Sequence, residues 1–163
     1  MNYNLQMEGS TVQPKILISA CLLGVQCRYD GKGNHVERLD ELMELAQLVP
    51  VCPEILGGLE TPRVPCERRG DRVVNRDGED RTKAFRRGAA EAHRIGEIFG
   101  AKYALLKQRS PSCGSVQVYD GTFSGKCIPG EGVTAQLLRA HGYRIFGEEQ
   151  VDQLIEELKQ IQA

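Results

Sequence analysis

The sequence predicts an α/β fold, in which a single domain is built as three layers around a mostly parallel, Rossmann-like sheet. Short apolar runs alternate along the chain with longer stretches whose apolar residues recur every three or four positions, which indicates strands alternating with amphipathic helices. The length of 163 residues is also typical of one domain. We therefore expect a flexible, mostly polar extension at residues 1–14 and a single α/β domain at residues 15–163.

The first half of the chain contains a predicted β-α-β unit. Residues 15–19 form its first strand, and a glycine-containing loop that ends in an Asp-Gly turn follows. Residues 36–47 predict a short helix with one buried face, made of Leu39, Leu42, Met43 and Ala46. Residues 48–51 form the second strand. Because residues 54–72 contain three glycines and two prolines, we expect a structured loop there rather than a helix.

The second half continues the alternation of strands and helices. Residues 82–99 predict the longest helix, because their apolar side chains fall on one stripe and Gly100 stands where a helix would end. A strand is expected at residues 103–107, and residues 116–118 and 122–123 are expected to pair as a small hairpin. The other predicted elements are a small strand at residues 73–74, a helix that opens near residue 130 and ends at Ala140, a strand at residues 143–146 and a helix at residues 151–161.

Composition argues against several kinds of partner. Charged residues make up 26% of the chain and the net charge is −1, so we expect no stable complex with nucleic acid. No apolar run approaches the roughly 20 residues that span a bilayer, so no membrane association is expected. The N-terminus also lacks the basic start and apolar middle of a signal peptide. These features predict a cytoplasmic protein.

Cysteines are the residues most suggestive of function. The chain has six, and in a reducing cytosol such cysteines more often bind metals or catalyse reactions than form disulfides. Cys21, Cys52 and Cys113 each come where a predicted strand ends and glycine or proline begins. If these strands are parallel neighbours, their carboxyl ends open into one crevice, where open α/β sheets usually bind ligands. Three thiolates there would suit zinc, copper(I) or an iron–sulfur cluster.

The remaining candidate ligands are weaker. Cys21 and Cys27 are separated by five residues, unlike the Cys-x2-Cys knuckle of a zinc finger, so a local zinc module is disfavoured. Cys66 and Cys127 follow no strong apolar run, and the simpler interpretation is that they are small buried hydrophobic residues. The three histidines are scattered along the chain, which disfavours a histidine metal ligand.

Several polar residues lie near the predicted crevice. Glu54, two residues after Cys52, can activate water or shuttle a proton, or it can simply cap a turn on the surface. Ser110, three residues before Cys113, can donate a hydrogen bond to a ligand or cap its own loop. A basic cluster in the 54–72 segment suits a phosphate group, although such runs usually form a solvated face. Its members are Arg63, Arg68, Arg69 and Arg72.

A series of sequence blocks carries a resemblance to a known family. The blocks are Ser19-Ala-Cys-Leu-Leu-Gly24, Cys27-Arg-Tyr-Asp-Gly31, Cys52-Pro-Glu54, Gly57-Gly-Leu-Glu-Thr-Pro-Arg63, Ser110-Pro-Ser-Cys-Gly114, Tyr119-Asp-Gly-Thr-Phe-Ser-Gly125 and Gly132-Val-Thr-Ala135. In this order they resemble the bacterial and archaeal family of thiouracil and thiouridine desulfidases, once catalogued only as a domain of unknown function. The resemblance covers nearly the whole chain beyond residue 14.

The resemblance implies an iron–sulfur enzyme. Its cofactor would be a [4Fe-4S] cluster with one open iron, held by Cys21, Cys52 and Cys113, with Cys27 as the main rival for a ligand position. Its substrate would be a small thiolated nucleobase or nucleotide, such as 2- or 4-thiouracil or 4-thiouridine monophosphate, from which sulfide is released without net redox change. The implied catalytic helpers are Glu54, which would activate water, and Ser110, which would orient the base.

Other functions remain open at this level. An electron-transfer or redox-sensing protein would use Cys27 as a fourth ligand and so close the cluster. A zinc-dependent hydrolase would use the same thiols. An interaction module with structural cysteines is disfavoured, because three of the thiols stand at strand ends.

Overall fold

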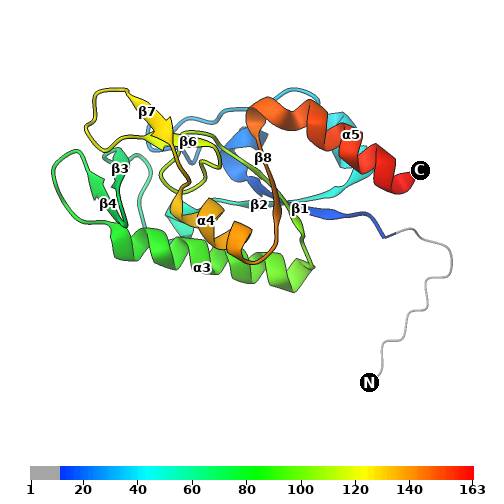
Figure 1. Ribbon diagram of the computed structural model, residues 1–163, viewed down its shortest axis with the longest axis horizontal. Coiled ribbons are helices and arrows are strands. Elements are labelled where there is room, and N and C mark those ends of the chain that lie inside the picture. The colour runs from blue at the N-terminus through cyan, green and yellow to red at the C-terminus, as the bar shows by residue number, and fades with distance from the viewer. Residues whose placement is uncertain (1–11) are drawn as a thin grey trace, which may run out of the picture.

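A four-stranded parallel sheet forms the centre of the molecule (Figure 1). The computed structural model describes residues 12–163, so most of the predicted N-terminal extension lies outside the described residues. The strands pair in the order β2-β1-β5-β8, all of them parallel. They are β1 (Lys15–Ser19), β2 (Gln47–Val51), β5 (Tyr103–Leu106) and β8 (Arg144–Gly147). The predicted α/β fold with a parallel sheet is confirmed.

Helices cover both faces of this sheet (Figure 1). One face packs against α3 (Thr82–Phe99) and α4 (Val133–Ala140), and the other against α1 (Leu39–Leu45) and α5 (Val151–Gln162). Alternate residues of a strand point to opposite faces, so Ile16 and Ile18 of β1 join the core under α1 and α5, whereas Leu17 joins the core under α3 and α4. Burial on both faces explains why the strands are continuous apolar runs.

The order in which successive strands join the sheet reverses at β1. From β1 the chain continues to β2 on one side, and the next strand of the sheet, β5, pairs with the other side of β1. In open α/β sheets, such a switch point leaves a crevice at the carboxyl ends of the strands. The loops that follow β1, β2 and β5 therefore leave the sheet side by side.

Two β-hairpins lie beyond this end of the sheet (Figure 1). The first pairs β3 (Cys66–Arg69) with β4 (Arg72–Asn75), and the second pairs β6 (Gln117–Tyr119) with β7 (Cys127–Pro129). The hairpins contact each other through β3 and β6. They form the outer wall of the crevice.

The structure differs from the prediction in the first β-α-β unit and the segment that follows it. Residues 54–72 are not all loop, because they contribute to the one-turn helix α2 (Pro53–Leu56) and contain β3. Proline is favourable at the first position of a helix, and the glycines that follow end α2 after one turn. The helix α1 is shorter than predicted because Ala46 already has the extended backbone that leads into β2. Met43 is consequently half-exposed rather than buried.

The second hairpin also differs from its prediction. The returning strand is β7, not residues 122–123. The carboxylate of Asp120 accepts hydrogen bonds from both the backbone N–H and the hydroxyl of Thr122, at 2.9 and 2.6 Å, which keeps the chain in a turn. Pairing with β6 therefore resumes only at Cys127.

Two glycines place α2 directly against α3. A Cβ atom added to Gly88 of α3 would overlap the carbonyl oxygen of Pro53, and one added to Gly57 would overlap the carbonyl oxygen of Ala84. The two backbones are thus in direct contact. This contact fixes the position of Pro53, and with it the two neighbours of Pro53 that the sequence singled out, Cys52 and Glu54.

We predict that Gly88→Ala lowers the free energy of unfolding by about 1–3 kcal/mol, the usual cost of overpacking. Alanine favours a helix by about 1 kcal/mol over glycine, but a backbone carbonyl cannot move aside, so the overlap dominates. Urea unfolding measures the change. Arg87→Ala, on the exposed side of the same helix, is the control and should change stability by less than about 0.5 kcal/mol. An unchanged or raised stability for Gly88→Ala would contradict the packing described.

Candidate active site

Five cysteines line one cavity of about 450 Å³ at the carboxyl ends of the strands, and four of them come from the loops that follow β1, β2 and β5. Cys21 lies in a short 3-10 helix, Ala20–Leu23, that directly follows β1, and Cys27 lies in the loop after it. Cys52 follows β2, and Cys113 lies in the loop after β5. The structure thus brings together the three cysteines predicted to meet at the crevice. Cys27, the predicted rival, lies with them.

Cys27 connects the thiols of two neighbouring strands. Its thiol is in hydrogen-bonding contact with the thiols of Cys21 and Cys52, and Cys52 Sγ also donates to the carbonyl oxygen of Cys27 at 3.8 Å. The contact with Cys21 raises the pKa of Cys27, and the contact with Cys27, together with burial, raises the pKa of Cys52. Burial raises the pKa of Cys113 to about 12. Without a cation these three thiols are therefore held in their neutral form.

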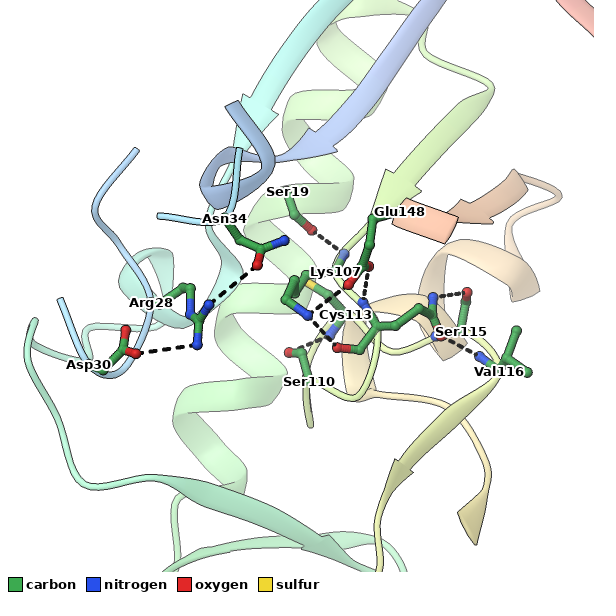
Figure 2. A network of polar contacts seen from close by, with 11 residues as sticks. Ser19, Arg28, Asp30, Asn34, Lys107, Ser110, Cys113, Ser115, Val116 and Glu148 are labelled. Carbon is green, nitrogen blue, oxygen red and sulfur yellow. Dashed lines mark hydrogen bonds and ion pairs between the residues drawn. The ribbon is translucent and has the colours of Figure 1, made fainter. Parts of the chain in front are cut away.

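Ser110 shapes the loop that carries Cys113 (Figure 2). Its hydroxyl oxygen accepts hydrogen bonds from the backbone N–H groups of Ser112 and Cys113, at 3.1 and 2.9 Å. Both bonds use the oxygen as acceptor, so the hydroxyl proton is left to donate toward the cavity, which Ser110 lines. The sequence allowed Ser110 to cap its own loop or to donate a hydrogen bond to a ligand. The structure shows the capping bonds, and these leave the hydroxyl proton free for a ligand.

The N-terminal end of α4 clamps the same loop. The backbone N–H of Thr134 donates to the carbonyl of Ser112 at 2.8 Å, and the buried hydroxyls of these two residues are also 2.8 Å apart. A Cβ atom on Gly132 would overlap the carbonyl group of Ser112. The Gly132-Val-Thr block of the sequence thus fixes the backbone next to Cys113.

Strand β8 supplies a third support (Figure 2). Glu148, which follows β8, accepts a hydrogen bond from Lys107 Nζ at 2.7 Å and a second one from the backbone N–H of Gln108. The backbone N–H of Lys107 donates to Ser19 Oγ at 3.0 Å. Sequence reasoning missed Glu148, because no local pattern shows that the end of β8 lies beside the end of β5.

Glu54 is partly buried, with its side chain 17% exposed, rather than exposed at a turn. It lies in the first turn of α2, and its carboxylate pairs with Arg63 at 3.2 Å. The Arg63 side chain is only 7% exposed and also donates to the carbonyl oxygen of Cys27 at 2.9 Å. Burial raises the pKa of Glu54, and the charge of Arg63 opposes this effect. A partly buried carboxylate beside the thiols can serve as a general base.

The predicted basic cluster is dispersed in the structure. Of its four members only Arg63 lines the cavity. Arg68 donates to Gln136 Oε1 at 2.9 Å, Arg69 to the carbonyl oxygen of Gly121 at 2.7 Å, and Arg72 to Asp80 at 2.9 Å. The cationic side chains that do line the cavity besides Arg63 are Arg28, Arg76, Lys107 and Arg109. A phosphate group in the cavity would contact these four residues and Arg63, whereas the other three arginines of the predicted cluster do not line the cavity.

Two cysteines and the histidines complete the list of candidates. Cys66 lines the cavity, and burial raises the pKa of its thiol to about 11, so Cys66 is part of the site rather than simply a packing residue. Cys127 on β7 and the three histidines are not among the residues that line this cavity.

Within residues 12–163, no set of three or more His, Cys, Asp or Glu side chains is gathered around a position for a single metal ion. In the same range, no helix has the length and apolar character needed to cross a membrane.

Comparisons with known proteins place this chain in a family. Residues 16–150 match the family model described as 2-thiouracil desulfurase. The "uncharacterized protein YbbK" of Bacillus subtilis (strain 168) is 41% identical over 150 residues, which cover 86% of this chain and 99% of YbbK. Among solved structures, the [4Fe-4S]-dependent thiouracil desulfidase TudS (DUF523Vcz) is similar with a TM-score of 0.86 and 45% identity, over 91% of this chain and 99% of TudS. The predicted resemblance is confirmed, and the chain belongs to the 2-thiouracil desulfurase family.

Proposed function

We propose that this protein is a [4Fe-4S]-dependent thiouracil desulfidase that replaces the sulfur of a thiolated uracil by oxygen. The observation that carries the proposal is the convergence of three strand-end thiols with Glu54 and Ser110 on one cavity. Membership of the 2-thiouracil desulfurase family and the 45% identity to TudS support it.

The donor set of the cavity fits an iron–sulfur cluster. Such clusters are held by cysteine thiolates, and four cysteines from the loops after three neighbouring strands line a space of about 450 Å³. Three of these thiols have raised pKa values, so a cationic group is needed before they can lie there as thiolates. We assign Cys21, Cys52 and Cys113 as the ligands, because each follows a different strand and the three can hold a cluster from separate sides.

The chain's own residues then direct water to the substrate. When bound, the cluster would supply a Lewis-acidic iron with affinity for the soft thiocarbonyl sulfur. Glu54, held by Arg63, accepts a proton from water while the water oxygen attacks the carbon that carries the sulfur. Ser110 donates a hydrogen bond to the pyrimidine as charge develops. As the C–S bond breaks, Glu54 passes its proton to the leaving sulfur and the added oxygen loses its second proton, which also ends on the sulfur. The products are a uracil carbonyl and hydrogen sulfide, and no electrons are exchanged.

We also propose that the substrate can be a nucleotide and that the protein acts in the cytoplasm. Exposed Arg76 and Arg109 line the cavity, which supports a nucleotide such as 4-thiouridine monophosphate as well as the free base. All six cysteines are free, which is the usual state in the reducing cytoplasm.

Sulfide release tests the activity. We predict that protein reconstituted anaerobically with iron and sulfide releases sulfide from 4-thiouracil and 4-thiouridine monophosphate, and that Cys113→Ala abolishes both the cluster absorbance and the release. Cys127→Ala is the matched control, because this cysteine does not line the cavity and its loss should change neither measurement. Absence of release from wild-type protein that carries its cluster would remove these substrates.

Glu54→Gln tests the general base separately from the cluster. The amide has nearly the same shape but cannot accept the proton of water, so we expect kcat to fall by about 10²- to 10⁴-fold. The cluster absorbance and the iron content should stay at the wild-type level. Full turnover in this variant would contradict the role assigned to Glu54.

Electron transfer is the second candidate function. The observation that favours it is that the thiol of Cys27 contacts those of Cys21 and Cys52. If Cys27 closed the cluster, no iron would be open to a substrate. We predict instead that Cys27→Ala keeps the cluster, and that adding 4-thiouracil changes the absorption spectrum of the wild-type protein at once. An unresponsive spectrum together with loss of the cluster in Cys27→Ala would favour the electron-transfer function.

A further inference from the structure

Phe123 has a backbone conformation that phenylalanine rarely adopts. It lies in the segment that joins β6 to β7, and its φ angle is +57°, in the left-handed region. The other residues of this segment with positive φ are Gly121 at +87° and Gly125 at +80°. Glycine takes this conformation without steric cost, whereas a residue with a Cβ atom is strained. Such strain is typical of residues whose side chain has a functional role.

A buried carboxylate holds Phe123 in this conformation. The backbone N–H of Phe123 donates to Glu67 Oε2 at 2.9 Å. Glu67 belongs to β3 in the other hairpin and is only 6% exposed. The contact therefore joins the two hairpins at the position of the strained residue. It fixes where the phenylalanine ring can lie.

The ring of Phe123 lies at the cavity. Phe123 is half-buried and lines the same space as Cys113, Glu54 and Ser110. The guanidinium groups of Arg69 and of Arg76, which also lines the cavity, each lie over the ring at 5.9 Å from its centre. The proposed active site thus has an aromatic wall flanked by cations, contributed by segments that carry none of the thiols assigned as ligands.

We propose that the pyrimidine ring of the substrate stacks on Phe123, and that Glu67 is the positioning residue that holds Phe123 for this contact. The inference rests on the proposed function. The thiocarbonyl sulfur and the contact from Ser110 hold only the edge of the base. Stacking on its face is equally strong in the bound substrate and in the transition state, so it strengthens binding and leaves the rate of the chemical step unchanged.

Phe123→Leu tests the stacking contact in the reconstituted holoenzyme. We expect the KM for 4-thiouracil to rise about tenfold and the dissociation constant of uracil, measured by anaerobic calorimetry, to rise equally. The kcat should stay within about twofold and the cluster absorbance should not change. Phe123→Tyr keeps the aromatic ring and should restore both constants. Phe99→Leu is the matched control, because Phe99 ends α3 away from the cavity.

Variants of Glu67 test whether this residue positions Phe123 or only stabilises the fold. Glu67→Ala removes the acceptor and should raise the KM as Phe123→Leu does, with kcat preserved, whereas Glu67→Gln retains an acceptor oxygen and should stay near wild type. An unchanged KM and unchanged uracil binding in Phe123→Leu would overturn the proposal, and so would loss of the cluster in that variant. If wild-type protein binds uracil but releases no sulfide, the proposed function fails while the stacking contact is still tested by uracil binding.

Discussion

The pairing of β1 with β2 on one side and β5 on the other sets the position of the four thiols that follow these strands. In the sheet register Ser19 faces Val51, and Ile18 lies between Pro50 and Leu105. Neighbouring strands are about 4.8 Å apart, so chains that leave three such strands at the same end start close together. Cysteines that are up to about ninety residues apart in sequence therefore meet because of three backbone ladders, and not because of any local motif.

Backbone contacts then turn this proximity into a defined geometry. The α2 helix touches α3 through glycine, and the Cys113 loop touches the start of α4 in the same way, so neither segment has room to shift. Hydrogen bonds that backbone N–H groups donate to Ser110 and to Glu148 hold the remaining loop atoms. A cluster bound only by side chains needs such rigid supports, because a site with the right ligands on loose loops would not hold its geometry.

The thiols of the cavity need a cationic occupant to lie there as thiolates. The contact with Cys27, together with burial, keeps Cys52 neutral in the form without a cofactor, and burial does the same for Cys113. Arg63 is already committed to Glu54 and the carbonyl oxygen of Cys27. The Glu54 carboxylate is therefore paired with a guanidinium, although it lies only two residues from Cys52. The outer hairpins add the aromatic and basic groups that a thiolated pyrimidine or its nucleotide would meet.

The sequence by itself determined which cysteines meet at one cavity and where the main strands and long helices lie. Apolar runs identified β1, β2 and β5, and a cysteine at the end of each was enough to predict their convergence, since parallel strands end at a common edge. Local patterns also predicted the full extent of α3, because an amphipathic stripe and a terminal glycine are properties of neighbouring residues. Only the tertiary structure decided the partner of Glu54, the support from Glu148 and the place of Phe123. These depend on contacts between segments far apart in the chain, and such contacts leave no periodic pattern in the sequence.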